Sequence, residues 1–301
     1  MHDPIPIAIF AFFTYLGFLS LTAAYVTAQA IIGHCLGLIV EKVSIGYDVP
    51  ESLRLRIRGR YWHWQIGLLL IGGYTKFKNS DVPSMDVRSD DRARSVDDSW
   101  NASEMTHLEN AGSFEAATLG RRIVILLVGP FTSLIIGLFA IGLGCWVDPQ
   151  RSLRWTTDPG RKLTASAVPG LVISEQPPSF LGQLQTALSV FSEGFQRLAL
   201  FQPLDGWCGL VGWMTTGGTV GRTSSGTWLT FIGITGLING IANLLPIGGL
   251  NGGHILLNII GGFSTRQSVK RLEYRFTLVG FLWLLTAFGR SIIADIIWMV
   301  G

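Results

Sequence analysis

The histidines and cysteines of this chain, which could bind a metal ion, form no familiar metal-binding motif. Its three cysteines, Cys35, Cys145 and Cys208, include no close-spaced pair, so neither a disulfide framework nor a zinc ribbon is indicated. The chain contains no His-Glu-x-x-His, the pattern that puts two imidazoles on one helical face beside a general base. His34 and Cys35 are adjacent, and adjacent side chains on a helix point about 100° apart. A metal site that combines these two residues with His254 is awkward, but it stays open as an alternative.

Polar groups also interrupt an otherwise apolar region near the C-terminus. An apolar helix is expected from about Trp228 until it meets Asn-Leu-Leu-Pro at residues 243–246. A glycine-rich turn that contains Asn251 follows, and a second apolar run begins at Ile255. Polar groups at membrane depth need partners and often mark functional sites. We therefore expect a cleft beside the Asn residues of this stretch.

The composition indicates an integral membrane protein. The chain has 301 residues, of which 48% are hydrophobic and only 14% charged, and its mean hydropathy is +0.41. Charged residues make up roughly a quarter of an ordinary soluble domain. The net charge of +3 and the lack of a basic cluster interleaved with aromatics argue against a nucleic-acid partner. We expect an α-helical polytopic protein in contact with the lipid bilayer.

Apolar runs predict about four transmembrane helices, separated by three more polar regions. A first helix that ran from residue 7 to Val40 would be roughly 50 Å long, well beyond the roughly 30 Å hydrocarbon layer. The run continues past Ala30 and its start is not basic, which argues against a cleaved signal peptide. The expected spans lie in residues 1–40, 121–147, 228–263 (together with the Asn-Leu-Leu-Pro motif) and 264–301 (after a basic segment).

The polar regions differ in character. Within residues 41–79, apolar and basic residues alternate over 53–58, which is typical of a half-buried strand, and a return strand is expected at 61–70. The Gly-Gly-Tyr at 72–74 is expected to bend the chain after this β-hairpin, which would lie at the lipid headgroups. Residues 80–120 are expected to form a polar loop. Residues 148–227 combine an amphipathic stretch at 181–200 with glycine-rich turns at 206–226.

The distribution of Lys and Arg predicts the orientation in the membrane. Twelve lie in residues 41–122 and four in 264–275, against six in 148–227. Because basic residues gather on the cytoplasmic side, we expect the hairpin there, and residues 148–227 and both termini on the outer side. The expected location is the inner (cytoplasmic) membrane of a bacterium.

Several stretches, in order along the chain, resemble the site-2 proteases, a family of intramembrane zinc metalloproteases. They are Val-Ser-Ile-Gly at 43–46, Ile-Gly-Gly-Tyr at 71–74, the segment from Arg121-Arg122 to Ser133, the motif at 243–256 and the basic stretch before the last span. The resemblance implies the site-2 protease core as the fold. It also implies an outward region with one or two PDZ domains, for which residues 148–227 leave too little room, so this module is expected to be reduced or absent.

The same resemblance indicates which positions would carry catalysis, and here the chain departs from the family. Ala30 stands in place of the first zinc-binding His, Ile31 in place of the Glu base, and Asn251 in place of the zinc-binding Asp, while His34 remains. Ser133 replaces a family Asn. We expect no bound metal and no cofactor, and we expect His34 to be a hydrogen-bonded interior residue.

These losses predict a pseudoprotease that binds a membrane-protein partner, either a single-span helix or an extended segment, as an accessory or scaffold subunit. The predicted partner-binding residues are Gly72, Gly73, Tyr74, Asn243, Pro246 and Asn251. Two alternatives stay open. One is an active metalloprotease with a rearranged metal site. The other is a permeation or proton pathway through Arg290 and Asp295, although a structural ion pair explains these two residues more simply.

Overall fold

A computed structural model describes the chain over residues 4–47, 55–59, 61–66, 69–78, 112–155, 171–200, 210–261 and 266–300. The chain divides into two compact units, which are considered separately. The helical unit is Met1–Tyr25 with Gly129–Gly301, and the sheet unit is Val26–Val128. Most of the predicted polar loop, residues 80–111, lies outside the described residues.

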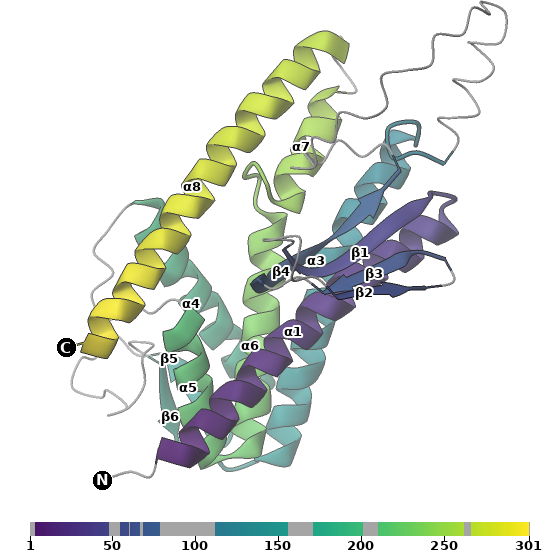
Figure 1. The fold of residues 1–301 in the computed structure, drawn as a ribbon. Coiled ribbons are helices and arrows are strands. Elements are labelled where there is room, and N and C mark those ends of the chain that lie inside the picture. The colour runs from purple at the N-terminus through teal and green to yellow at the C-terminus, as the bar shows by residue number, and fades with distance from the viewer. Residues whose placement is uncertain are drawn as a thin grey trace, which may run out of the picture. The chain divides into compact units, whose positions relative to one another are not determined.

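Four helices of the described chain are long and apolar enough to cross a membrane (Figure 1). The expectation of an α-helical protein with four spans is therefore confirmed. The four spans are Ala8–Cys35 within α1 (Pro4–Cys35), α3 (Leu119–Val147), α6 (Ser225–Leu244) and Leu272–Ile297 within α8 (Arg266–Val300).

The first helix ends earlier than expected. Gly37 has a φ of 82°, and the N–H of Leu38 donates to the Gly33 carbonyl (2.9 Å). A glycine in the left-handed conformation that closes such a bond is a common helix C-terminus. The prediction of a helix to Val40 was therefore wrong, and Val40 is instead the first residue of a strand.

In the helical unit, α3 and α6 pack with their backbones in close contact. A Cβ added at Gly233 would lie 2.7 Å from the carbonyl oxygen of Gly137 and 2.8 Å from the amide nitrogen of Ile141. Gly236 and Gly144 also lie at this crossing. Small residues allow such approach between helices in a membrane, where van der Waals packing drives association.

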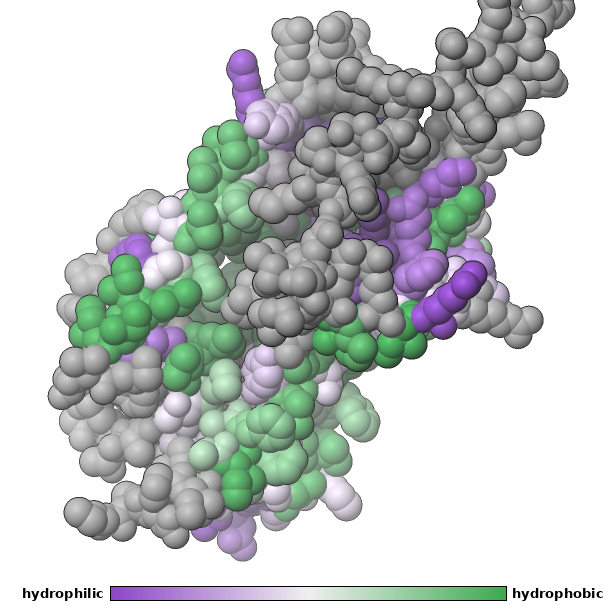
Figure 2. Space-filling model, in the orientation of Figure 1, coloured by the Kyte–Doolittle hydropathy of each residue, from purple (hydrophilic) through white to green (hydrophobic). Residues whose placement is uncertain are grey.

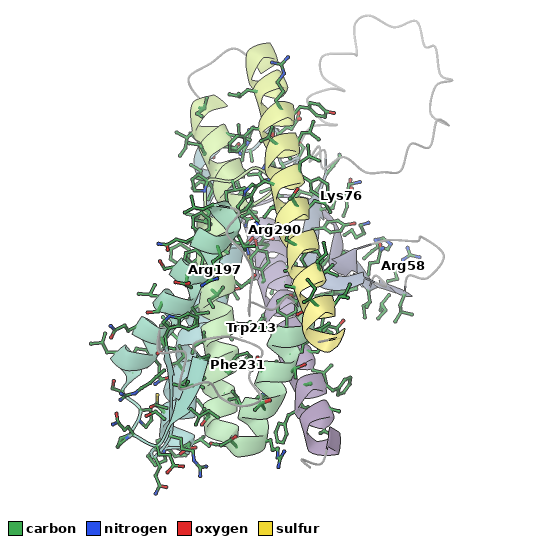
Figure 3. All side chains as sticks on the ribbon, turned by 90° about the vertical axis from the view of Figure 1, so that its left-hand side faces the viewer. Arg58, Lys76, Arg197, Trp213, Phe231 and Arg290 are labelled. Carbon is green, nitrogen blue, oxygen red and sulfur yellow. The ribbon has the colours of Figure 1, made fainter. Side chains whose placement is uncertain are left out.

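A third helix, α5 (Leu210–Thr223), packs on α6. The prediction of glycine-rich turns at 206–226 was therefore wrong for residues 210–223. The glycines pack closely instead: a Cβ at Gly217 would meet the Thr14 side chain at 2.5 Å. The ring centroids of Trp213 on α5 and Phe231 on α6 are 4.7 Å apart (Figure 3). Helix packing thus overrides the low helix propensity of glycine.

The remaining elements of the helical unit follow the spans or join them. Strands β5 (Ser152–Trp155) and β6 (Leu171–Ser174) pair antiparallel. The predicted amphipathic stretch is confirmed as α4 (Phe180–Ala199), whose N-cap Ser179 accepts a hydrogen bond from the Gly182 N–H. A short helix, α7 (Asn251–Gly261), follows the Asn-Leu-Leu-Pro motif.

Asp148 joins the end of α3 to the start of α6. Its carboxylate accepts hydrogen bonds from the Ser224 hydroxyl and from the N–H groups of Gln150 and Arg151 (both 3.2 Å). Burial alone would raise the pKa of Asp148, but these hydrogen bonds and the charge of Arg151 together hold it below its usual value. Because the pKa is lowered by folding, the stabilisation from Asp148 is present above its unfolded-state pKa and is lost as the pH falls through the folded one.

The sheet unit contains a four-stranded sheet with the order β2-β3-β1-β4. Its strands are β1 (Val40–Tyr47), β2 (Leu55–Arg58), β3 (His63–Ile66) and β4 (Leu69–Phe77). The predicted hairpin is present as the antiparallel pair β2–β3, but the prediction of one return strand over 61–70 was wrong, because β3 ends at Ile66 and Leu69 begins β4. The predicted bend at Gly72-Gly73-Tyr74 was wrong, because these residues lie within β4, which pairs antiparallel with β1.

The two faces of this sheet have different chemistry. On one face, Val43 and Phe77 are buried, and the Thr75 hydroxyl donates to the Val26 carbonyl of α1 (2.8 Å). On the other face, the Lys42 ammonium lies 5.1 Å from the centre of the Tyr74 ring. Hydrophilic residues gather over the sheet on the surface shown in Figure 2. Packing on α1 thus fixes which face is apolar.

We expect Gly233→Ala to destabilise the protein by about 1–3 kcal/mol, because the new methyl group would overlap backbone atoms of α3. The matched control is Gly142→Ala on α3, where the added Cβ meets nothing closer than 4.0 Å. There the better helix propensity of Ala favours an unchanged or slightly higher stability. Unfolding titrations in mixed micelles measure both variants. Equal stability of the two would contradict the close crossing.

Candidate functional site

The end of α1, in the sheet unit, carries three of the positions singled out in the sequence. Ala30 is fully buried, Ile31 is 47% exposed, and His34, one turn further on, is exposed. A methyl and a branched alkyl group have no lone pair to offer a metal and no proton to exchange. Of the three side chains, only the His34 imidazole is capable of such chemistry.

The prediction that His34 is an interior residue was wrong. Its ring lies against the turn between β2 and β3, with its centroid 5.2 Å from that of Tyr61 and 6.1 Å from that of Trp62. The adjacent Gly33 faces the Phe77 ring closely, which turns this side of the helix toward β4. His34 is therefore at the exposed rim of an aromatic cluster.

In the helical unit, the Asn-Leu-Leu-Pro motif forms a tight turn between α6 and α7. Gly249 has a φ of 89°, a conformation that glycine adopts without strain. A Cβ at Gly252 would collide with the Leu244 carbonyl, and one at Gly253 with the Ile247 carbonyl. Asn251 is the first residue of α7 and is half-buried. These glycines fix the backbone path of the turn regardless of the side chain at position 251.

A polar network joins α3 and α6 just before this turn. The Asn239 amide donates to the Ser133 hydroxyl (3.1 Å), and the Asn243 amide donates to the carbonyl of Asn239 (2.9 Å) and to its side-chain oxygen (3.2 Å). Ser133 is fully buried. Buried polar groups that satisfy one another in this way fix the relative position of two helices.

Sequence reasoning singled out Ser133 and Asn243 but missed Asn239. The available signal was its position one helical turn before Asn243 in an apolar run, which puts both amides on one face of α6. Pro246, also predicted, is exposed at the start of the turn. Asn239, Asn243, Pro246 and Asn251 therefore belong to one end of α6 and the turn after it.

The other predicted partner-binding residues lie on an edge strand. In the strand order of the described chain, β4 is at one end of the sheet, and Gly72, Gly73 and Tyr74 are half-buried on it. A strand at the edge of a sheet presents backbone N–H and C=O groups to a further strand. Gly72 has a φ of 89°, near the irregular pairing of β1 and β4 between Ile45 and Tyr47.

The donor set does not fit a zinc site. Zinc in proteins is held by thiolate, imidazole and carboxylate groups, with three or four of them from the protein. Within each unit, no three His, Cys, Asp or Glu side chains of the described residues gather as a metal site would require. An amide such as that of Asn251 is a weak substitute for an anionic ligand.

Asp295 has a structural role in the helical unit. Its carboxylate oxygens accept hydrogen bonds from the backbone N–H groups of Val211 and Gly212, at 3.0 Å each. These are the second and third residues of α5, so the carboxylate caps that helix and meets the positive end of its dipole. Asp295 is buried. This cap explains why an acidic residue lies in the last span, and no proton pathway is needed to explain it.

The sequence model described as Peptidase family M50 matches residues 30–287, a range that includes most of the sheet unit, part of the helical unit and the positions Ala30, Ile31, His34 and Asn251. No curated protein matches the chain.

We expect the Ser133–Asn239 hydrogen bond to show a positive coupling energy in a double-mutant cycle of Ser133→Ala and Asn239→Ala. Hydrogen bonds between membrane helices average about 0.6 kcal/mol and reach about 1.7 kcal/mol, and Ser133 is fully buried. Unfolding in mixed micelles gives the four stabilities. A control cycle replaces Ser133→Ala with Thr286→Ala, whose exposed hydroxyl donates to its own helix, and its coupling should be near zero. Equal coupling in the two cycles would contradict the network.

Proposed function

Because the chain belongs to peptidase family M50, the site-2 protease family, we propose that it is a proteolytically inactive member that binds a membrane-protein partner as an accessory or scaffold subunit. The observation that carries the proposal is the loss of donors where the family has its zinc ligands and base. Ala30, Ile31 and Asn251 occupy three of these four positions, and only His34 matches. One imidazole cannot hold zinc against water.

The surroundings of these positions support the same interpretation. Ala30 is fully buried on α1, so an imidazole there would need space that neighbouring atoms now occupy. Ser133, where the family has Asn, is engaged with Asn239 of α6. Groups around a metal site orient its ligands and adjust their basicity. The network in the helical unit instead links α3 to α6 through hydrogen bonds between protein groups.

Partner binding would use the edge of β4 that faces away from β1. A segment in extended conformation adds to such an edge through main-chain hydrogen bonds, and pockets for alternate side chains give specificity. The strand is nine residues long and is tied to α1 through Thr75 and Val26. Because Gly72 and Gly73 lack side chains, an incoming backbone meets little steric obstruction there. The edge is therefore a preformed surface for a membrane protein's extended segment.

The turn after α6 offers a second recognition surface. Asn243 and Asn251 are half-buried and Pro246 is exposed, so this turn presents two amide-bearing side chains close to a span. In a membrane, polar groups gain from a polar partner because lipid chains offer none. A single-span helix with a polar residue at the matching depth would suit this surface.

The setting of the proposed complex follows from the basic residues. We place the sheet and residues 264–275 on the cytoplasmic side, and residues 148–227 with both termini on the outer side, of a bacterial inner membrane. The asymmetry of Lys and Arg supports this orientation. An active protease with a rearranged metal site is the second candidate, and it rests on the retention of His34, Cys35 and His254.

We expect that Ala30→His, Ile31→Glu and Asn251→Asp together will not restore proteolysis. The triple variant regains the ligands and the base, but not the surrounding groups whose loss typically costs about 10–100-fold in affinity or activity. The measurement is zinc per chain and cleavage of a panel of single-span substrates by the purified protein in detergent. The unaltered protein should carry no stoichiometric zinc. Robust cleavage by the triple variant, or one zinc per chain in the chelator-washed unaltered protein, would contradict the proposal.

We expect a photoreactive phenylalanine analogue at Tyr74 to cross-link a discrete membrane protein in native membranes. The matched control puts the same analogue at Tyr274 on α8, which is 67% exposed but lies on no sheet edge. Adducts should form at Tyr74 in higher yield and with a different mass, because the β4 edge positions the partner's backbone. Identical adducts at the two sites, or none at Tyr74, would count against the edge as the binding surface.

A further inference from the structure

A polar pocket of about 380 Å³ lies in the helical unit, between the β5–β6 pair and the N-terminus of α4. We propose that this pocket binds the phosphate group of a membrane phospholipid. It is independent of the proposed partner-binding function and of every position discussed for catalysis. The residues that carry the argument are Ser152, Arg154, Ser179, Gly182 and Gln183.

The pocket has the donors that a phosphate requires. The guanidinium of Arg154 offers a planar fork of N–H groups that matches phosphate oxygens. The pocket also includes Ser179 and Gly182 at the start of α4. The Gly182 N–H already donates to the Ser179 side chain, but the positive end of the helix dipole still favours an anion there. Among the described residues that line the pocket, none is Asp or Glu. The lining is therefore positive and rich in donors.

A second observation, independent of the helix terminus, points to a bound ligand. Ser152 lines the pocket and is only 3% exposed, yet its hydroxyl has no hydrogen-bond partner among the described residues. A buried hydroxyl without a partner costs free energy, and most buried polar groups in proteins are satisfied. A phosphate oxygen in the pocket would accept this hydrogen bond.

The walls of the pocket are held in place. The Gln183 side-chain oxygen accepts a hydrogen bond from the Leu153 N–H (3.3 Å), and the Thr186 hydroxyl donates to the Leu153 carbonyl (3.2 Å). Gln183 and Thr186 are both buried. Because these two bonds engage the N–H and the carbonyl of the same residue, Leu153, they fix α4 against β5. The donors are thus arranged before a ligand arrives, which lowers the cost of binding.

The position of the pocket favours a lipid over free phosphate. Phe180, the first residue of α4, lies beside the α3 span, since a Cβ on Gly142 would be 4.0 Å from its ring. Phe180 is 44% exposed and Leu181 is 75% exposed, so the helical turn that contributes Ser179 and Gly182 to the pocket also carries two exposed apolar side chains. Trp155 lines the pocket, and tryptophan is enriched at the headgroup level. Acyl chains would contact the apolar side chains while the phosphate enters the pocket.

The test is a titration of the delipidated full-length protein in detergent, followed by native mass spectrometry. The probes are phosphatidylglycerol, diacylglycerol with the same chains, and inorganic phosphate. We expect phosphatidylglycerol to bind, and Arg154→Gln to weaken it about tenfold by removing the strongest donor. Diacylglycerol, which lacks the phosphate, should bind at least tenfold more weakly than phosphatidylglycerol. Displacement of phosphatidylglycerol by millimolar inorganic phosphate would support the anion site but assign its ligand to free phosphate.

The matched control is Arg151→Gln, which removes the same charge three residues away, where the side chain donates to the Thr223 carbonyl outside the pocket. It should leave phosphatidylglycerol affinity within about twofold of the unaltered protein. Ser152→Ala gives a second readout: the lipid-free protein should melt at an equal or higher temperature, and phosphatidylglycerol should raise that temperature less than before. Equal effects of Arg154→Gln and Arg151→Gln, or equal binding of diacylglycerol, would overturn the proposal.

Discussion

The close crossing of α3 and α6 is the constraint on which the helical unit depends. Neither helix gains from burying apolar side chains in a solvent that is itself apolar, so direct packing must hold them together. Gly137 and Gly233 permit backbone contact at the crossing, and this contact brings Ser133 within 3.1 Å of Asn239. Asp148 then joins the same two helices at their aqueous end. The glycines allow the two helices to approach closely, and the polar groups then fix their relative position.

The backbone path of the turn after α6 is set by its glycines. Gly252 and Gly253 are required by neighbouring carbonyl groups, and none of these contacts involves the side chain at position 251. An amide and a carboxylate are nearly equal in size, so under the proposed function either group at position 251 is compatible with this backbone path. Ala30 is compatible with the fold in a similar way, because its buried methyl group needs no polar partner. Under the proposed function, the scaffold persists because partner binding requires its shape and not its donors.

The sequence predicted those parts of the fold that depend on local pattern. Long apolar runs identified the four spans, and alternating residues at 53–58 identified the β2–β3 pair. It failed where distant contacts decide. The glycines of α5 resemble turn residues until Thr14 and Phe231 fill the space beside them. The parallel pairing of β1 with β3 leaves no local signature either, and the sheet it completes places Gly72 to Tyr74 inside a strand.

The residues of the candidate site also differ in whether a local sequence pattern predicts them. Residues that match a family motif, such as His34 and Asn251, could be found from spacing alone. Asn239 matches no motif, and its role appears only when α3 brings Ser133 opposite it. The cap of Asp295 on α5 joins residues more than eighty positions apart, and no local sequence pattern predicts it. The role of a side chain therefore depends on the groups that packing places next to it. A carboxylate at a helix N-terminus stabilises the fold, whereas a carboxylate beside a metal would perform chemistry.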